Sequence, residues 1–313
     1  MPHPPRPNRK DKHNPTPLWT TVILLAAIVA AICLTLYLRQ KPAPTGTVTP
    51  KHPIPTIAPS AKKHLVTPKP PALPTPKIAK KTSTAKFVLV IDDMGYHKKV
   101  GDALLNLPLD LTFAFLPFAP HTESQLKRAQ KQGRDILLHL PMEATDKKWN
   151  PGPGALTVSM SQEELQRTVL RDLAAIPNAI GINNHMGSKF TENEPAMRDF
   201  LHLLKERNLF FLDSQTSPNS VGSKVASQLG VLTMRRNVFL DNQQDKDIIK
   251  KQLDTLVFLA KKQGIAIGIA HPHQATLDAL RDYQLNHDKS VTMVSIRELL
   301  ENKTTRAQNT RKP

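Results

Sequence analysis

Short apolar runs that end in acidic or histidine side chains recur through the C-terminal two thirds of this chain. In the first, residues 87–91 are all apolar and deliver two adjacent carboxylates, Asp92 and Asp93, to the end of the run. Neighbouring carboxylates repel each other, so a protein keeps such a pair at the end of a buried strand where a cation binds or where one of them acts as a base. A solvated turn is the alternative for this pair taken alone.

Five further runs end in the same way. Their terminal residues are His139, His185 (preceded by Asn183 and Asn184), Asp213 with Ser214, Asp241, and His271 with His273. Any one of these side chains can simply cap a strand end. In a parallel α/β protein, however, the carboxyl ends of the strands meet at one edge. The recurrence therefore predicts a single rim of metal ligands and proton carriers.

Helical patterns separate these runs. A helix is expected from Ser161, because residues 162–164 add an acidic first turn and apolar residues then recur at helical spacing up to Ile176. Gly133 and Gly264 are expected to end two other helices. The alternation predicts an α/β domain over residues 86–301, a closed or nearly closed parallel barrel of seven to eight β/α units. A doubly wound open sheet is the alternative, although no glycine-rich fingerprint follows any strand.

The N-terminal segment predicts a membrane anchor. Residues 18–38 form an uncharged run of 21 residues, which is long enough to cross a bilayer core. Residues 1–17 carry four basic side chains and one acidic side chain, so the positive-inside rule places them in the cytoplasm. We expect a single-pass protein of the cytoplasmic (inner) membrane, with the rest of the chain on the periplasmic or outer side. A cleavable signal peptide is the alternative, but its apolar run is usually only ~7–15 residues long.

Most of the positive charge lies outside the expected barrel. Residues 39–85 contain eleven prolines and no acidic residue, a composition that predicts a disordered linker, and residues 302–313 form a basic tail. Residues 87–301 carry 25 basic and 25 acidic side chains, although the whole chain has a net charge of +17. We expect no nucleic-acid partner. Basic arms fit anionic lipids or wall polymers, or they serve solubility alone.

Two further features of the sequence limit what the exported part can do chemically. Cys33 is the only cysteine and lies in the apolar run, which excludes disulfides and cysteine-ligated zinc from the exported part. A loop of about 20 residues lies between His139 and Ser161, and loops of this length are often functional lids. Trp149 in this loop is expected either to stack on a sugar ring or to anchor the loop on the barrel.

Five ordered motifs resemble those of a known family. They are IDDMG at 91–95, LLHLPME at 137–143, NNHMGS at 183–188, FLDS at 211–214 and IGIAHP at 267–272. Together they resemble the divergent polysaccharide deacetylase family of the bacterial envelope, over about residues 87–300. The resemblance implies a distorted (β/α) barrel that removes acetyl groups from sugars by metal-assisted hydrolysis. It also implies an envelope polysaccharide, such as peptidoglycan, as the partner.

The resemblance assigns roles to four residues. Asp92 is the implied base that activates water, Asp93 and His185 are implied metal ligands, and His271 is the implied acid that protonates the leaving amine. The expected cofactor is a divalent metal, with zinc favoured. Such an ion, held with one open position, lowers the pKa of bound water to about 7 and polarises the acetyl carbonyl.

The chain departs from the superfamily pattern at two points. The usual second histidine, four residues after His185, is replaced by Lys189. Either His139 supplies the third ligand, or the site binds metal weakly and has lost catalysis. The superfamily's arginine motif has no clear counterpart, and Arg235 and Arg236 are the available candidates.

Other polar residues of the rim are expected to orient the ligands or to contact substrate. These are Asn184, Ser188, Asp213, Asp241 and Trp149, and Asp213 in particular is expected to orient His271 or a metal ligand. Two hypotheses follow from the sequence. One is a membrane-anchored, metal-dependent carbohydrate deacetylase acting on envelope glycan, and the other is an inactive barrel that binds glycan or envelope proteins at the same rim.

Overall fold

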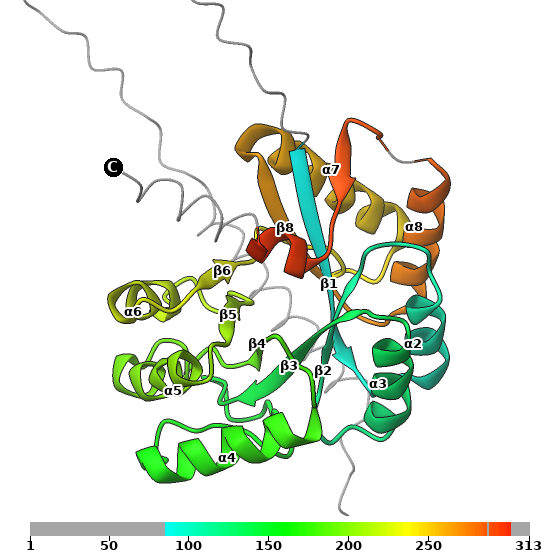
Figure 1. Cartoon of the computed structure of the whole chain (residues 1–313). Helices are drawn as coiled ribbons and strands as arrows, with labels where there is room; N and C mark the ends of the chain where they lie inside the picture. The colour runs from blue at the N-terminus through cyan, green and yellow to red at the C-terminus, as the bar shows by residue number, and fades with distance from the viewer. Residues whose placement is uncertain (1–84, 287, 302–313) are drawn as a thin grey trace, which may run out of the picture. The chain divides into compact units, whose positions relative to one another are not determined.

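Strand and helix alternate along the domain, as the sequence pattern predicts (Figure 1). The structure is a computed structural model, and it describes residues 85–286 and 288–301. In chain order the elements are β1 (Ala85–Met94), α2 (Lys98–Leu105), β2 (Thr112–Phe115), α3 (Thr122–Lys131), β3 (Asp135–Met142), α4 (Gln162–Ala175), β4 (Gly181–Met186), α5 (Glu194–Glu206), β5 (Phe210–Asp213), α6 (Gly222–Leu229), β6 (Thr233–Arg235), β7 (Val238–Phe239), α7 (Lys246–Gln263), β8 (Ile265–Ala270), α8 (Gln274–Leu285) and β9 (Val291–Met293). Residues 296–301 add a short final helix.

Local sequence signals set the helix ends. At the start of α4, Ser161 Oγ accepts from the Glu164 backbone N–H at 3.2 Å, and Glu164 Oε2 accepts from the Ser161 N–H at 2.9 Å. This reciprocal capping box satisfies two N–H groups that the helix cannot pair internally. At the far end of α7, Gly264 has a φ of +85°, a conformation that glycine adopts without a Cβ clash.

The strands form one curved sheet in which every described pairing is parallel. Their order is β6-β5-β4-β3-β2-β1-β8-β7, and β9 pairs with the beginning of β1. The strands at the two ends of this order are neighbours in the chain, because only Arg236 and Asn237 separate β6 from β7. The Arg236 N–H donates to Asp213 O of β5, and the Asn237 N–H donates to Ile267 O of β8. This short segment therefore brings the two edges of the sheet together, and the fold is an incomplete, distorted barrel.

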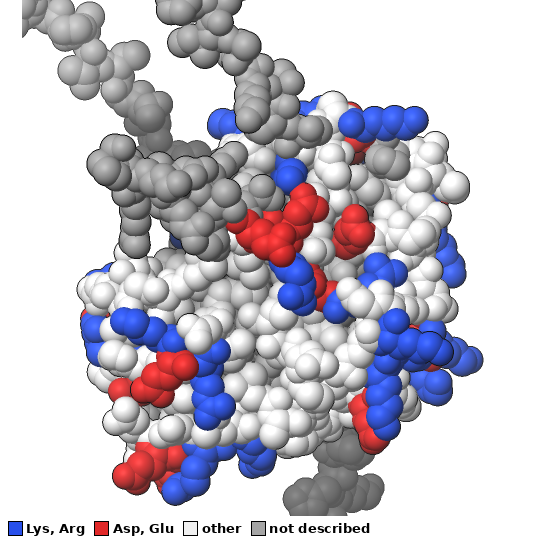
Figure 2. Space-filling view, in the orientation of Figure 1, with Lys and Arg blue, Asp and Glu red and all other residues white. Residues whose placement is uncertain are grey.

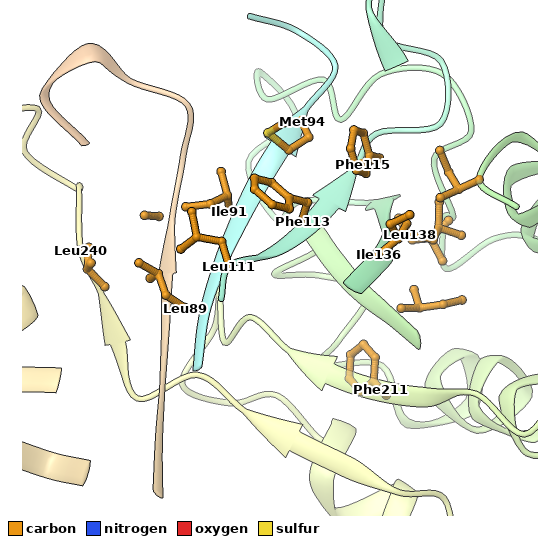
Figure 3. Close-up of a cluster of buried hydrophobic side chains, with 14 of the residues drawn as sticks. Leu89, Ile91, Met94, Leu111, Phe113, Phe115, Ile136, Leu138, Phe211 and Leu240 are labelled. Atoms are coloured by element: carbon orange, nitrogen blue, oxygen red, sulfur yellow. The ribbon is translucent and has the colours of Figure 1, made fainter. Parts of the chain in front are cut away.

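The hydrophobic core has two layers. Alternate strand residues point outward and pack under the helices, among them Leu89, Ile91, Phe113 and Leu138 (Figure 3). The remaining residues point inward and fill the barrel, and these are Val88, Val90, Ala114, Leu137, Phe210, Leu212, Met234, Ile267 and Ile269. A fully buried Leu or Phe contributes roughly 1.5–3 kcal/mol, so both layers are substantial sources of stability.

The C-terminal segment closes the base of the barrel. Val294, Ile296 and Leu299 join the inward layer, and the final helix crosses the sheet in Figure 1. Arg297 donates to the buried Asp135 at the start of β3, through its backbone N–H at 2.8 Å and its Nε at 3.0 Å. These contacts fill the base of the barrel.

Charge on the visible face of the domain is mixed. Basic and acidic side chains are interspersed in Figure 2, as expected from their equal numbers in residues 87–301. The predicted anchor at 18–38, the linker at 39–85 and the basic tail at 302–313 lie outside the described residues, apart from Ala85. Within the described part of the chain, no helix has both the length and the apolar character needed to cross a bilayer.

Candidate metal and catalytic centre

The strand alternation that fills the barrel also builds a polar layer above it. On β1 the inward positions are Val88, Val90 and then Asp92, and on β8 they are Ile267, Ile269 and then His271. The corresponding inward residues at the ends of the other strands are His139 on β3, Asn183 on β4, Ser214 after β5 and Arg236 after β6. Because side chains alternate with a period of two, the residues that follow the interior layer meet at the carboxyl end of the barrel.

Three potential ligand atoms converge at this end. Asp93 Oδ1 lies 3.1 Å from His139 Nε2 and 2.9 Å from His185 Nδ1, and the two histidine nitrogens are 3.1 Å apart. Adjacent ligands on a tetrahedral zinc with ~2.0–2.1 Å bonds are about 3.3 Å apart, so this triangle is close to the size a zinc-like ion requires. The side chains of Asp93 and His185 are 27% and 15% exposed, so the triangle lies close to the domain surface.

The backbone at Asp93 brings its side chain into the triangle. Asp93 follows Asp92 directly and would point out of the barrel in a regular strand. Instead its φ is +53°, and the pairing of β1 with β2 shifts register between Ile91 and Met94. This local distortion aims both neighbouring carboxylates at the same centre. Asp93 Oδ1 is buried and has no well-directed hydrogen bond, which leaves its lone pairs available to an ion.

Asn183 connects the ligand His139 to the base candidate Asp92. Its Oδ1 accepts from His139 Nδ1 at 3.0 Å, and its Nδ2 donates to Asp92 Oδ1 at 2.7 Å. With the proton held on Nδ1, the lone pair of His139 Nε2 is directed at the triangle. The second oxygen of Asp92 is left without this bond and lies 3.8 Å from His139 Nε2. Asn183 is fully buried, and it is a site residue that was not predicted from the sequence.

Burial and charge act in opposite directions on this cluster. Burial raises the pKa of Asp92 above its ordinary value, although His139 and His271 partly oppose the shift. Burial also favours a raised pKa at Asp93, but the close approach and charge of the His139 and His185 imidazoles hold the pKa of Asp93 far below its usual range. Asp93 is therefore ionised at any physiological pH. An ion that binds here replaces protons on the histidines, so its affinity must fall as pH falls.

His271 is paired with Asp241. His271 Nδ1 donates to Asp241 Oδ1 at 2.9 Å, and the second carboxylate oxygen accepts from the His271 N–H at 2.6 Å and from Thr276 Oγ1 at 2.8 Å. Burial acts to lower the pKa of His271, but the hydrogen bond and charge of Asp241 outweigh it and raise the pKa to about 9. His271 is therefore a protonated imidazolium at neutral pH, and its Nε2 can donate to a substrate.

Arg236 lies between β6 and β7 and is held by the backbone of the β5–α6 connection. Its Nε donates to Ser214 O at 2.7 Å, its Nη2 donates to Gln215 O at 2.9 Å, and its guanidinium stacks on Phe239 at 5.2 Å. Burial lowers the pKa of Arg236, while the carboxylates of Asp92 and Asp213 act to raise it. A partly buried cation near Asp92 stabilises the ionised form of that carboxylate. Arg235, the other candidate, is exposed and bonds Gln215.

Three of the remaining predicted residues bond to loops at the carboxyl ends of the strands, and Trp149 is exposed. Asn184 accepts from the Ser214 N–H at 2.9 Å and so joins the ends of β4 and β5. Ser188 accepts from the Thr145 N–H at 3.0 Å, and Trp149 is 59% exposed on the β3–α4 loop. Asp213 accepts from Ser220 Oγ and the Gln215 N–H, which orders the β5–α6 loop, whereas the partner of His271 is Asp241.

Lys189 does not face the ligand triangle. Its Nζ pairs with Glu143 Oε1 at 2.6 Å, and the other oxygen of Glu143 accepts from the Val158 N–H at 2.9 Å. The position where the superfamily pattern has its second histidine therefore ties down the long loop, while His139 occupies the third corner of the triangle. Arg236 had a signal in the sequence, since it lies two residues beyond the inward Met234, whereas Asn183 comes two residues after Gly181, which adds no side chain to the inward layer.

The fold and the site together define a parallel α/β barrel with a three-ligand centre beside an aspartate and a histidine–aspartate pair. The family model for divergent polysaccharide deacetylases matches residues 89–300, and the chain belongs to this family. An uncharacterized protein of Escherichia coli K12, YibQ, is 35% identical over 229 residues, covering 73% of this chain and 70% of the relative. An uncharacterized protein of Haemophilus influenzae is 34% identical over 218 residues, covering 70% of this chain and 78% of that protein.

A solved structure shares the fold. The crystal structure of the uncharacterized protein ATU2773 from Agrobacterium tumefaciens C58 superimposes with a TM-score of 0.66 at 23% identity. The match covers 69% of this chain and 89% of that one. The polysaccharide deacetylase superfamily is typically metal-dependent, and the Asp93, His139 and His185 group has the composition such a metal site needs.

Proposed function

We propose that this protein is a metal-dependent hydrolase that removes acetyl groups from amino sugars of an envelope glycan. The observation that carries the proposal is the convergence of Asp93 Oδ1, His139 Nε2 and His185 Nδ1 within 3.1 Å of one another, next to a buried carboxylate and an imidazolium. Two nitrogens and one oxygen with an open side are the ligand set of catalytic zinc sites. When bound, such an ion polarises the acetyl carbonyl and acidifies water.

The chain's own residues supply the proton transfers. Asp92 takes a proton from the attacking water through the carboxylate oxygen that Asn183 does not bind. His271 donates its Nε2 proton to the nitrogen of the breaking amide bond, so that the products are acetate and a free amine. Asp241 keeps His271 protonated until that step and stabilises its orientation. Each positioned acid or base contributes about 10²–10⁴ to such a rate.

Acetate release by purified residues 85–313, whose core lies wholly within the segment, tests the proposal. The substrate is a chito-oligosaccharide, and the assay compares metal-stripped with zinc-loaded protein. We expect zinc-dependent release that falls about 10²–10⁴-fold in Asp92→Asn without loss of bound metal. The exposed α7 variant Asp254→Asn serves as the control and should retain full activity. Metal binding without acetate release from any acetylated glycan would favour the alternative, a barrel that binds glycan or envelope proteins without turnover.

We further propose that residues 18–38 anchor the protein in the cytoplasmic membrane and that the barrel acts on its outer side. The basic flank and the uncharged run support this topology. A reporter fused after Pro313 should be active only when it is exported. Activity of a reporter that works solely in the cytoplasm would contradict the proposed location.

A further inference from the structure

Asp93 adopts a backbone conformation that its neighbours must hold in place. Its φ is +53°, in the left-handed region that residues with a Cβ rarely occupy. Such a conformation persists where the surrounding structure fixes the chain on both sides. On one side, the buried Asp92 accepts a hydrogen bond from Asn183. What fixes the other side therefore determines whether Asp93 Oδ1 reaches the ligand triangle.

A buried glutamine of α3 holds the turn between β1 and α2, which we define as residues 94–98. Gln125 is fully buried, and its Oε1 accepts from the Gly95 N–H at 3.0 Å. Its Nε2 donates to His97 O at 3.1 Å and to Lys98 O at 3.3 Å. Both polar atoms of the amide thus have partners, as buried polar atoms require. All three partners are backbone groups of the β1–α2 turn.

The amide of Gln125 is also tightly packed. Gly101 of α2 lies against it, and a Cβ at that position would be only 2.5 Å from Nε2. Gly95 is similarly confined, because its φ is +107° and a Cβ there would clash with Thr122 of α3. The packing of α2 beside α3 (Figure 1) therefore leaves little room for the amide or the turn to shift.

The other bonds of the turn do not depend on a particular side chain. Met94 O accepts from the Leu116 N–H at 3.1 Å, and Gly95 O accepts from the His121 N–H at 2.8 Å. Both bonds join backbone groups. The Gly95 N–H is different, because an apolar residue at position 125 would leave it buried without this partner. An unpaired buried N–H is costly, so the turn would then move toward water.

We propose that Gln125 is a positioning residue for the metal centre. By fixing the Gly95 N–H, it holds Asp93 in the left-handed conformation that directs Oδ1 into the ligand triangle. Only Met94 separates Gly95 from Asp93, so a shift of the turn is transmitted directly to the ligand. The proposal rests on the proposed function, because the metal centre gives this conformation its use. It assigns a role in metal affinity to a buried residue of α3, outside the set of ligands at the strand ends.

The zinc affinity of purified full-length protein tests this role, measured by competition with a chelating dye. Gln125→Met keeps an unbranched side chain of similar size but removes its bonds to the turn. We expect the zinc affinity to fall about tenfold or more, since loss of an outer partner of a metal ligand costs about 10–100-fold. In an Asp93→Ala background the same change should leave the remaining affinity within about twofold, because Gln125 acts through Asp93.

Thr112→Val is the matched control. Thr112 is also fully buried, and its Oγ1 accepts from the Ile296 N–H at 3.2 Å at the base of the barrel. This variant also leaves a backbone N–H without its side-chain acceptor, so its stability should fall while its zinc affinity stays at the wild-type value. In metal-free protein, amide hydrogen exchange at Gly95 should quicken in Gln125→Met and not in Thr112→Val.

Equal zinc affinities of wild type and Gln125→Met would overturn the role of Gln125, and so would a loss that Thr112→Val matches or that persists without Asp93. If Gln125→Met does not fold, Gln125→Asn keeps the amide but withdraws it by one methylene, and it is judged by the same outcomes. Wild-type protein that binds no zinc would overturn the metal centre together with this role. Zinc binding without acetate release would overturn the hydrolase alone, so the failures are distinguishable.

Discussion

Two groups of one aspartate and two histidines lie at the carboxyl ends of the strands, and they differ in how the carboxylate is used. In the first group, Asp93 Oδ1 approaches His139 and His185 without a well-directed hydrogen bond. In the second, Asp241 accepts three hydrogen bonds, two from His271 and one from Thr276. The lone pairs of Asp93 Oδ1 are available to an ion, whereas those of Asp241 already accept hydrogen bonds. Residue composition alone therefore does not identify a metal site.

The largest expected effect separates the two groups by metal affinity. His185→Ala removes one corner of the ligand triangle, so zinc affinity should fall by more than about 100-fold, because even loss of an outer partner of a metal ligand costs about 10–100-fold. His273→Ala removes a histidine of the second group and should leave the affinity within about twofold. Competition with a chelating dye measures both. Equal losses in the two variants would show that the groups are not functionally distinct.

The second prediction concerns protonation of His271. Its pKa is raised to about 9, so its pair with Asp241 stabilises the folded protein fully below about pH 6.5, and this contribution is lost as pH rises through about 9. Asp241→Asn should therefore destabilise the domain at pH 6.5 by on the order of 1–3 kcal/mol, and the difference from wild type should shrink by pH 10.

Urea unfolding at the two pH values measures this difference, and the imidazole resonances of His271 report its pKa directly. The alkaline limit of any hydrolytic rate should also move from about pH 9 toward neutrality in Asp241→Asn. A stability difference that does not change between pH 6.5 and 10 would mean that Asp241 contributes packing and hydrogen bonds without controlling the charge of His271.

The smallest effect is expected at Lys189, which occupies the position of the superfamily's second histidine but pairs with Glu143 instead. Lys189→Met removes a partly exposed ion pair with Glu143 and should cost less than about 1 kcal/mol of folding stability. Zinc affinity should be unchanged, because the triangle is complete without residue 189. Thermal unfolding and the same dye competition provide the measurements. A large loss of zinc affinity would place Lys189 in the metal site and reject His139 as the third corner.

The sequence contained most of the fold and part of the centre. The parallel α/β alternation follows from apolar runs and helix signals, and the residues that end those runs are the ones that gather at one end of the barrel. Asn183 and Arg236 are harder to identify from the sequence, because each is recognised only by its place in the alternation of inward and outward side chains along a strand. Asp93 does not follow this alternation, because its side chain points inward only through its positive φ.

Strand order accounts for the remaining differences. Asp213 and Asp241 both follow strands, so sequence gives no reason to prefer one as the partner of His271. In the fold β7 pairs directly with β8, whereas β5 pairs with β4 and β6. Asp241 is therefore adjacent to His271 and Asp213 is not. The division of one short segment into β6 and β7 depends on closure of the barrel, which no local pattern encodes.

The pairing of β1 has a consequence for how the domain is made. Its neighbours include β8 and β9, so Lys86 pairs with Ile265 and Phe87 with Met293, near the opposite end of the domain. During synthesis, the apolar residues 87–91 leave the ribosome long before these partner strands exist. The barrel can close only after almost the whole domain has been translated, and contacts of such long sequence separation fold slowly. Until then β1 is prone to aggregate, so folding of this domain depends on synthesis of its last strands.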